Sequence, residues 1–209
     1  RGMSASRNLG IYHARGDYIA LLDADDVWAS AKTEEQVAIL QAHSEAAMVY
    51  GPLLWWYSWS GLPGDAGRDR PQHLGIEANR VVHPPRLLHL CLSQEGETPL
   101  PSGMLIRRRT LQDIGGFEAR FRGMYEDQAF HVKLSLTAPI YVSDRVWCKW
   151  RKHDDSCCAV SVKRQQFEQA HRAFLQWVEA YFRYAGVVDP ALWAALTRAL
   201  PPDNLLSFL

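Results

Sequence analysis

The chain has 209 residues, enough to bury the core of one domain, and its 23 basic residues balance its 23 acidic residues. This balance disfavours broad electrostatic capture of nucleic acid. No apolar run approaches the ~20 residues that a membrane-spanning helix requires, and the opening segment 1–4 lacks the apolar stretch of a signal peptide. The four cysteines form no CxxC pair and have no histidine spacing typical of zinc, so we expect reduced thiols in a cytoplasmic protein.

Short apolar runs alternate with helical patterns along the chain, which predicts an α/β fold. A first helix is expected over 4–14, followed by a strand over 18–22. Because this strand carries no charge, we expect it to be central in its sheet and buried on both faces. The later predicted elements are helices over 32–43, 86–92, 108–114 and 128–136, strands over 46–50, 53–59, 140–142 and 146–152, and a loop that enters a strand over 100–106.

The last fifty residues carry no motif that we can assign. Their spacing of apolar residues predicts one long helix over about 160–184 and a final helix from Asp189 through Ala199. We expect the aromatic stripe of the long helix to pack against the rest of the chain. A homodimer face or a face that lies on a membrane surface is the alternative for this stripe.

Three carboxylates, Asp23, Asp25 and Asp26, follow the predicted strand 18–22 directly. Like charges gathered at one strand end cost free energy unless a cation neutralises them. Ligands bind at the carboxyl ends of strands in open α/β sheets, and Mg²⁺ and Mn²⁺ take oxygen ligands that they often share with phosphates. The cluster therefore favours a divalent cation that carries a phosphorylated ligand. A solvated turn or a helix cap is the alternative interpretation.

Three separated blocks of the chain carry a shared pattern. The first, 6–26, ends in an Asp-x-Asp motif; the second comprises 102–107, 114–118 and Tyr125-Glu126-Asp127; the third, 150–156, reads Trp-Arg-Lys-His-Asp-Asp-Ser. In order and spacing these blocks resemble glycosyltransferase family 2, the inverting nucleotide-sugar transferases with a GT-A fold. The resemblance covers about residues 1–160 and implies a GT-A-like, Rossmann-related mixed sheet flanked by helices.

The resemblance also implies two domains and a missing N-terminal segment. It assigns 1–159 to the catalytic domain and leaves 160–209 as a helical extension. The strands that open the family pattern, and that hold the base and ribose of the nucleotide, have no counterpart in this sequence. We therefore expect the chain to be truncated at its N-terminus.

The resemblance gives roles to the donor side of the site. It makes Asp25 the direct metal ligand, places Asp23 at the ribose or at the metal's water shell, and places Asp26 at the metal or the donor sugar. It brings His153 to the metal or the diphosphate, and Arg7 and Arg151 to the diphosphate. A helix cap by Asp26, a solvated His153 and a surface salt bridge of Arg7 remain open as alternatives.

The second block implies the catalytic base. Asp127 matches the family's base position, which takes the proton from the acceptor hydroxyl, and Glu126 is adjacent. Because the two are neighbours in sequence, we expect only one of them to face the pocket. The resemblance places Ser102 and Gly103 on the acceptor side, and Trp28 is a candidate there for stacking on a sugar.

The resemblance therefore implies an inverting glycosyltransferase that uses Mn²⁺ or Mg²⁺ and takes part in bacterial polysaccharide biosynthesis. The expected donor is a nucleotide-sugar, most consistently a UDP-sugar, and the acceptor a saccharide or a lipid-linked hydroxyl. We expect a cytoplasmic location, with peripheral membrane attachment as an option. Two alternatives remain: a truncated, non-catalytic binding domain of the same fold, and another metal–phosphate enzyme such as a nucleotidyltransferase.

Overall fold

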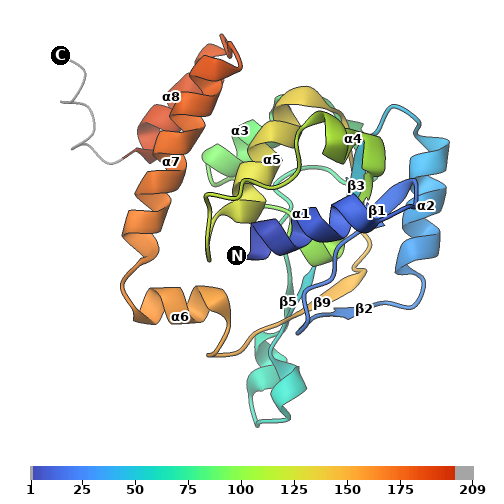
Figure 1. Cartoon of the computed structure of the whole chain (residues 1–209). Coiled ribbons are helices and arrows are strands. Elements are labelled where there is room, and N and C mark those ends of the chain that lie inside the picture. The colour runs from blue at the N-terminus through green and yellow to red at the C-terminus, as the bar shows by residue number, and fades with distance from the viewer. Residues whose placement is uncertain (1, 201–209) are drawn as a thin grey trace.

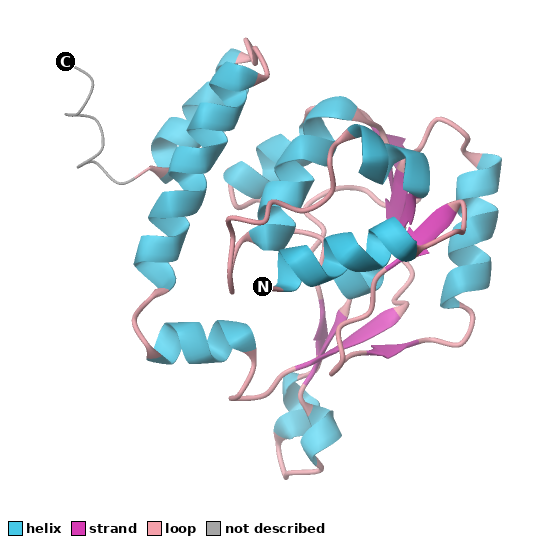
Figure 2. Cartoon of the chain, viewed as in Figure 1, coloured by secondary structure: helices cyan, strands magenta, loops and turns pink. Residues whose placement is uncertain are grey.

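The computed structural model describes residues 2–200, which form two small sheets flanked by helices (Figures 1 and 2). The larger sheet contains, in spatial order, β1 (Tyr18–Ala20), β7 (Leu105–Arg107), β3 (Met48–Tyr50), β8 (Ile140–Val142) and β6 (Arg80–Val82). The smaller sheet contains, in order, β2 (Val27–Trp28), β9 (Cys148–Arg151), β4 (Leu54–Trp56) and β5 (Arg70–Pro71). The pairs β3–β8 and β4–β9 are parallel, and the other pairs are antiparallel. The expected mixed sheet is confirmed.

Side chains alternate between the two faces of each strand, so both faces of the larger sheet present apolar residues. Helices cover both of these faces. The first helices in the chain are α1 (Met3–His13), α2 (Lys32–Ala42), α3 (Arg86–Leu92), α4 (Arg108–Asp113) and α5 (Glu126–Thr137). Met48 and Tyr50 face a core that includes side chains of α1, α3, α4 and α5. Val49, between them, packs instead with Leu40 of α2 on the opposite face. The sheet is thus the middle layer of three.

The strand expected over 18–22 is shorter and less buried than predicted. It ends at Ala20, and β1 lies at the edge of the larger sheet, paired with β7 alone. Only Ile19 of β1 is buried, and Leu22 beyond it is 49% exposed. The expectation of a central strand buried on both faces is therefore wrong for this strand. An uncharged run reports apolar character, but burial also depends on which elements lie beside it.

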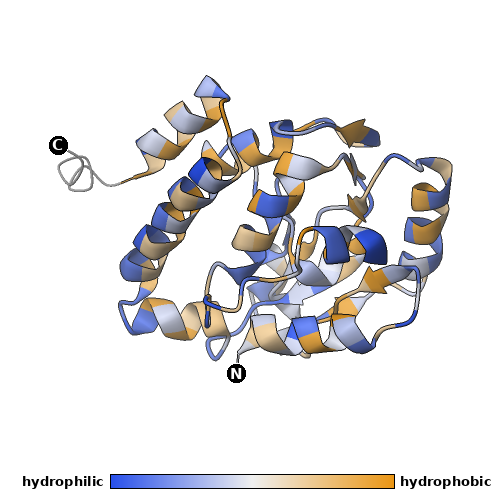
Figure 3. Ribbon diagram, turned by 45° about the horizontal axis from the view of Figure 1, so that its top comes forward, coloured by the Kyte–Doolittle hydropathy of each residue, from blue (hydrophilic) through white to orange (hydrophobic). Residues whose placement is uncertain are grey.

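The C-terminal part of the chain packs against the preceding part, and the two form a second hydrophobic core. It contains α6 (Cys157–Lys163), α7 (Phe167–Tyr184) and α8 (Pro190–Ala199), and Asp189 caps α8 through its side chain. Apolar residues of α7 and α8 are buried together with residues of α3 and α5. Figure 3 shows hydrophilic and hydrophobic residues along α7, as expected for a helix with one face on a core. Within residues 2–200, no helix combines the length and apolar character needed to cross a membrane.

The expectation of a single helix over 160–184 is wrong, because α6 ends at Lys163 and α7 begins only at Phe167. Ser156 caps α6 by accepting a hydrogen bond from the backbone of Ala159, and Gln165 then takes a left-handed conformation with φ of 56°. No glycine or proline marks this break in the sequence. The apolar spacing continues across it, which is why the pattern favoured one helix.

Short 3₁₀ turns complete the fold. The segment 61–75 contains η2 (Asp65–Arg68) and β5, and it follows η1 (Ser58–Ser60). The Asp69 carboxylate accepts hydrogen bonds from the backbone N–H groups of Tyr57 and Ser58, which folds this loop back onto the end of β4. A third turn, η3 (Pro101–Gly103), leads into β7.

Candidate active site

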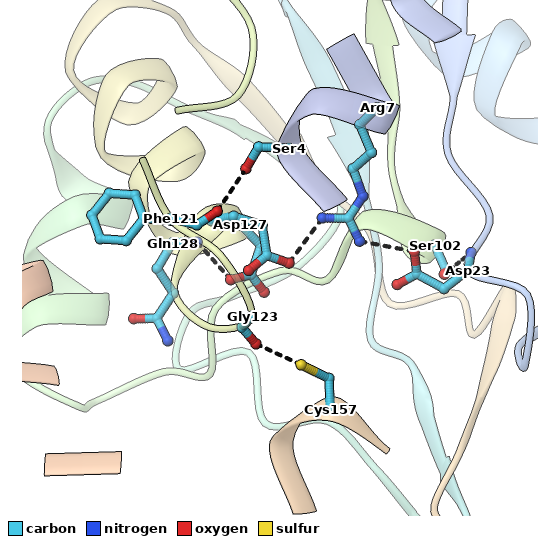
Figure 4. Close-up of polar contacts among 10 residues, drawn as sticks. Ser4, Arg7, Asp23, Ser102, Phe121, Gly123, Asp127, Gln128 and Cys157 are labelled. Atoms are coloured by element: carbon cyan, nitrogen blue, oxygen red, sulfur yellow. Dashed lines mark hydrogen bonds and ion pairs between the residues drawn. The ribbon is translucent and has the colours of Figure 1, made fainter. Parts of the chain in front are cut away.

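Arg7 of α1 joins two of the three sequence blocks. Its Nη2 lies 2.8 Å from Oδ1 of Asp23, and its Nη1 lies 3.0 Å from Oε1 of Glu126 (Figure 4). Burial lowers the pKa of Arg7, but the two carboxylates outweigh this effect and raise it. The guanidinium therefore holds the loop after β1 beside the first turn of α5. Sequence alone could not distinguish this arrangement from a surface salt bridge.

The position of α1 is fixed by a second contact at its neighbouring residue. The Asn8 amide donates to the backbone oxygen of Phe117 and accepts from its N–H, both at 2.8 Å. Gly115 and Gly116, which end α4, both have positive φ, and a Cβ on Gly116 would lie 2.6 Å from Oδ1 of Asn8. The close approach of Asn8 thus requires glycine at 116, which explains why these motif residues occur together.

The third block meets the first at the Asp-x-Asp turn. His153 Nε2 lies 3.0 Å from Oδ2 of Asp25, and the Arg151 side chain donates from Nε to the backbone oxygen of Asp25 at 2.8 Å. The backbone N–H of Arg151 donates to Oδ1 of Asp26 at 3.2 Å. These contacts follow from the antiparallel pairing of β2 with β9.

Asp26 serves this junction rather than a helix. The residues that follow it form β2, so the alternative of a helix cap is ruled out. Burial raises the pKa of the Asp26 carboxyl to about 6, while hydrogen bonds from Ser102 and the Arg151 backbone lower it and the charges of Asp23 and Asp25 raise it. Its carboxylate lies on the interior side of the turn.

Asp25 and His153 are the residues that fit a divalent cation. They present one carboxylate and one imidazole nitrogen at a partly exposed position, and both groups are ligands of first-row divalent metals. Asp23 contributes its carboxylate to Arg7 instead. Among residues 2–200, no three His, Cys, Asp or Glu side chains come together as a complete ligand set. Two protein ligands suit a cation that takes its other ligands from phosphates and water.

Three consecutive backbone carbonyls beside the Asp turn are held by side chains. Trp28 Nε1 donates to the carbonyl of Ser102 at 2.7 Å, Gln36 Nε2 to that of Gly103 at 2.8 Å, and Lys32 Nζ to that of Met104 at 3.2 Å. Ser102 is fully buried, and its hydroxyl accepts the N–H of Asp23 at 3.0 Å. The segment expected on the acceptor side thus positions the Asp turn directly.

Lys32 and Gln36 are site-supporting residues that the sequence analysis missed. Both are fully buried on α2, where Lys32 Nζ also donates to Oε1 of Gln36 at 2.8 Å. Lys32 lies 4.3 Å from the ring centroid of Trp28, and burial lowers its pKa to about 8. Their spacing of four places them on one helix face, but their partners lie far away in sequence. No local signal identifies such partners.

Glu126 and Asp127 point in different directions at the start of α5. Glu126 is buried against Arg7, whereas Asp127 lines a pocket of about 540 Å³. The Asp127 carboxylate accepts the N–H of Gln128 at 2.8 Å (Figure 4). Burial, together with the charge of Glu126, raises the pKa of Asp127. A partly protonated carboxyl facing a pocket is suited to accept or donate a proton near neutral pH.

The comparisons with known proteins agree with this arrangement. Residues 1–57 match the family model described as Glycosyl transferase family 2. The expected resemblance to glycosyltransferase family 2 is confirmed over these residues. The matched segment contains Arg7 and the whole Asp-x-Asp turn. No curated protein sequence matches the chain.

Solved structures confirm the GT-A-like fold. S. aureus TarS in complex with UDP-GlcNAc superposes with a TM-score of 0.57 at 18% identity, over 96% of this chain and 62% of that one. A second structure of the same TarS fragment gives a TM-score of 0.53 at 16% identity, over 96% of this chain and 61% of that one. A longer S. aureus TarS chain gives 0.54 at 19% identity, over 97% of this chain and 37% of that one. The chain thus spans less than two thirds of each of these TarS chains.

Proposed function

We propose that this chain is the catalytic part of an inverting, metal-dependent glycosyltransferase that moves a sugar from a nucleotide-sugar to an acceptor hydroxyl. One observation carries the proposal: Arg7 pairs with Asp23, which belongs to the same turn as Asp25, and with Glu126, which precedes Asp127 at the start of α5. Metal-side and base-side carboxylates are the two components that this reaction needs. A UDP-sugar is the proposed donor, because the TarS structure of the same fold holds UDP-GlcNAc.

The residues divide the chemistry between them. Asp25 and His153 would hold Mn²⁺ or Mg²⁺, which when bound acts as a Lewis acid toward the departing diphosphate. Arg151 lies beside them, anchored by its Nε, and adds positive charge on the diphosphate side. Asp23 orients the donor, and Arg7 neutralises the charge of the Asp23 carboxylate.

Asp127 is the proposed general base. Its carboxylate takes the proton of the acceptor hydroxyl as that oxygen attacks the anomeric carbon from the face opposite the diphosphate. Glu126, held by Arg7, keeps its own charge away from the pocket and supports the raised pKa of Asp127. Ser102 and Gly103 act on the acceptor side by fixing the turn that adjoins it.

Four free thiols support a reducing, cytoplasmic setting for this activity. The proposed acceptor is a saccharide or a lipid-linked hydroxyl in bacterial polysaccharide synthesis.

Replacement of Asp127 tests the assignment of the base. We expect Asp127→Asn to lower the release of UDP from UDP-GlcNAc with Mn²⁺ by about a hundredfold or more, because general base catalysis contributes about that much. Asp113→Asn, which alters an exposed carboxylate on α4, is the matched control and should keep full turnover. Wild-type turnover in Asp127→Asn would remove Asp127 from the mechanism.

The pH profile adds a second readout. The base works only when deprotonated, so a raised pKa moves the acid limb of kcat/KM to higher pH than an ordinary aspartate would give. The residual activity of Asp127→Asn should lack this limb. No release by the wild type from UDP-, GDP- or dTDP-sugars would favour the non-catalytic binding domain.

A further inference from the structure

Two residues that line the pocket beside Asp127 each have a buried polar atom without a partner. The pocket lies between the tryptophans of the smaller sheet and the helices α5 and α7, and Trp55, Trp150, His131 and His171 are among its lining residues. Nε2 of His131 and Nε1 of Trp55 make no hydrogen bond within the described structure. Leaving such atoms unpaired costs free energy, so two of them in one pocket indicate a ligand that pairs them.

His131 lines this pocket and has an unpaired ring nitrogen. It is 4% exposed, and its imidazole hydrogen-bonds to the backbone of Pro99. Because Nε2 is the unpaired nitrogen, Nδ1–H makes that bond. Burial lowers the pKa of His131 to about 4, so the ring is neutral at physiological pH and Nε2 carries a lone pair. This atom needs a donor such as a hydroxyl.

Trp55 presents a donor and little else. Arg70 lies 3.9 Å and Lys152 4.3 Å from its ring centroid, and Trp150 packs against it edge-on at 4.9 Å. With its ring covered by these side chains, Trp55 is poorly placed to stack on a sugar. Its Nε1–H instead requires an acceptor oxygen. A hydroxyl group both donates and accepts, so a ligand with several hydroxyls satisfies Trp55 and His131 together.

The charges that line the pocket disfavour an anionic ligand. Two carboxylates, Glu97 and Asp127, line it, and no lysine or arginine is among the described residues that do. Arg70, close to Trp55, is paired with Glu97 at 2.9 Å. Lys152 lies over the rings of Trp55 and Trp150 but is not among the residues that line the pocket. A phosphate group would therefore meet two carboxylates and no cation in the lining itself, which is unfavourable. The volume of about 540 Å³ falls within the range of small-molecule sites.

We propose that this pocket is a subsite for a neutral, polyhydroxylated part of the acceptor, a sugar or polyol unit, with His131 accepting from one hydroxyl and Trp55 donating to another. The inference rests on the proposed function, since it places the acceptor next to Asp127. It adds the substrate class and two specificity residues that belong to none of the three sequence blocks.

The indole N–H of Trp55 is a direct reporter of this subsite. Among the eight tryptophan indole signals in a proton–nitrogen correlation spectrum, assigned with Trp55→Phe, glucose or sorbitol should shift the Trp55 signal downfield and saturably. Glucose 6-phosphate should bind at least about fivefold more weakly. Equal or tighter binding of the phosphate, or shifts of similar size in all indoles, would overturn the proposal.

His131 supplies the matched pair of variants. His131→Phe keeps an aromatic ring and removes the acceptor, and it should weaken glucose or sorbitol binding about five- to tenfold, the value of one hydrogen bond. His89→Phe is the control, because Nδ1 of His89 is also unpaired but His89 is outside the pocket lining. Equal affinity in both variants would contradict the role of His131. UDP binding with Mn²⁺ in the same proteins separates the proposed function from the proposed subsite. If UDP binds while sugars fail to bind, the subsite is wrong and the proposed function stands.

Discussion

At the scale of single residues, the site depends on one buried cation between two carboxylates. Arg7 and Glu126 have side-chain exposures of 10% and 7%, so their contact is shielded from water, whereas Asp23 is 41% exposed. Breaking a buried pair from one side leaves an uncompensated charge, which costs more than the pair itself contributes. Arg7 is therefore more important for the geometry of the site than its surface-like sequence context indicates.

Arg7→Met should lower the free energy of unfolding by about 3 kcal/mol, because the Glu126 carboxylate stays buried without its partner. Urea denaturation measures this loss. Arg109→Met, which breaks an exposed pair with Asp113, should leave the unfolding free energy unchanged within error. Adding Glu126→Gln to Arg7→Met should restore part of the loss. An Arg7→Met variant as stable as the wild type would contradict a buried, coupled pair.

At the scale of elements, two contacts position the loops that carry the motifs. Asn8 attaches α1 to the chain after α4, and the side chains of Lys32 and Gln36 attach α2 to the segment that enters β7. Each contact satisfies backbone groups that would otherwise be buried and unpaired. Both can be tested separately from catalysis.

The two glycines after α4 provide a matched comparison. Gly115→Ala places a Cβ in open space and carries only the strain of its positive φ, about 1 kcal/mol. Gly116→Ala adds a clash with Asn8 Oδ1 to the same strain, so we expect a loss of about 2 to 3 kcal/mol. Thermal denaturation of both variants, alone and with Asn8→Ala, checks this. Equal losses for 115 and 116 would show that Asn8 does not restrict this position.

Because of Lys32, we expect the free energy of unfolding to change with pH in the alkaline range. Its pKa is near 8 in the folded chain and 10.5 when unfolded, so the unfolded state binds more protons between these values. Unfolding free energy should therefore rise with pH in this window, by about 2 kcal/mol relative to Lys32→Met. Urea titrations at pH 8 and pH 10 measure the difference, with the exposed Lys163→Met as control. Parallel curves for wild type and Lys32→Met would contradict a desolvated ammonium.

Sequence patterns predicted where most helices and strands lie along the chain, but not which elements pack beside them. The helix over 86–92 and the strand over 140–142 were predicted with the observed bounds, because local periodicity and Pro84-Pro85 determine them. The burial of 18–22 and the continuity of 160–184 were predicted wrongly. Burial depends on neighbouring strands, and the break at Gln165 has no local sequence signal.

The site was predictable where its residues lie in local motifs. Asp25 and His153 come from blocks that could be read one at a time, and the fold brings them to 3.0 Å. Lys32 and His131 could not be found in this way. Their significance arises only from buried partners, or missing partners, on elements distant in sequence.

At the scale of the whole molecule, the three sequence blocks meet where the two sheets and α5 adjoin. The turn after β1 leads from the larger sheet into the smaller one, and β9 brings the third block back beside it. We retain 1–159 as the proposed catalytic domain and 160–209 as its proposed helical extension. Within the described part of that extension, α7 and α8 share a core with α3 and α5, and α7 forms one wall of the pocket at Asp127. The extension thereby contributes to the proposed acceptor side.

Calorimetric titration of UDP with and without Mn²⁺, on the wild type and on Asp25→Asn, tests whether the Asp-x-Asp turn binds a metal together with a diphosphate. We expect UDP to bind the wild type with Mn²⁺ and to bind at least about tenfold more weakly without it. Asp25→Asn should abolish this metal dependence because one of the two protein ligands is lost. UDP affinity that is the same with and without Mn²⁺, or unaffected by Asp25→Asn, would contradict a metal–diphosphate site at the Asp-x-Asp turn.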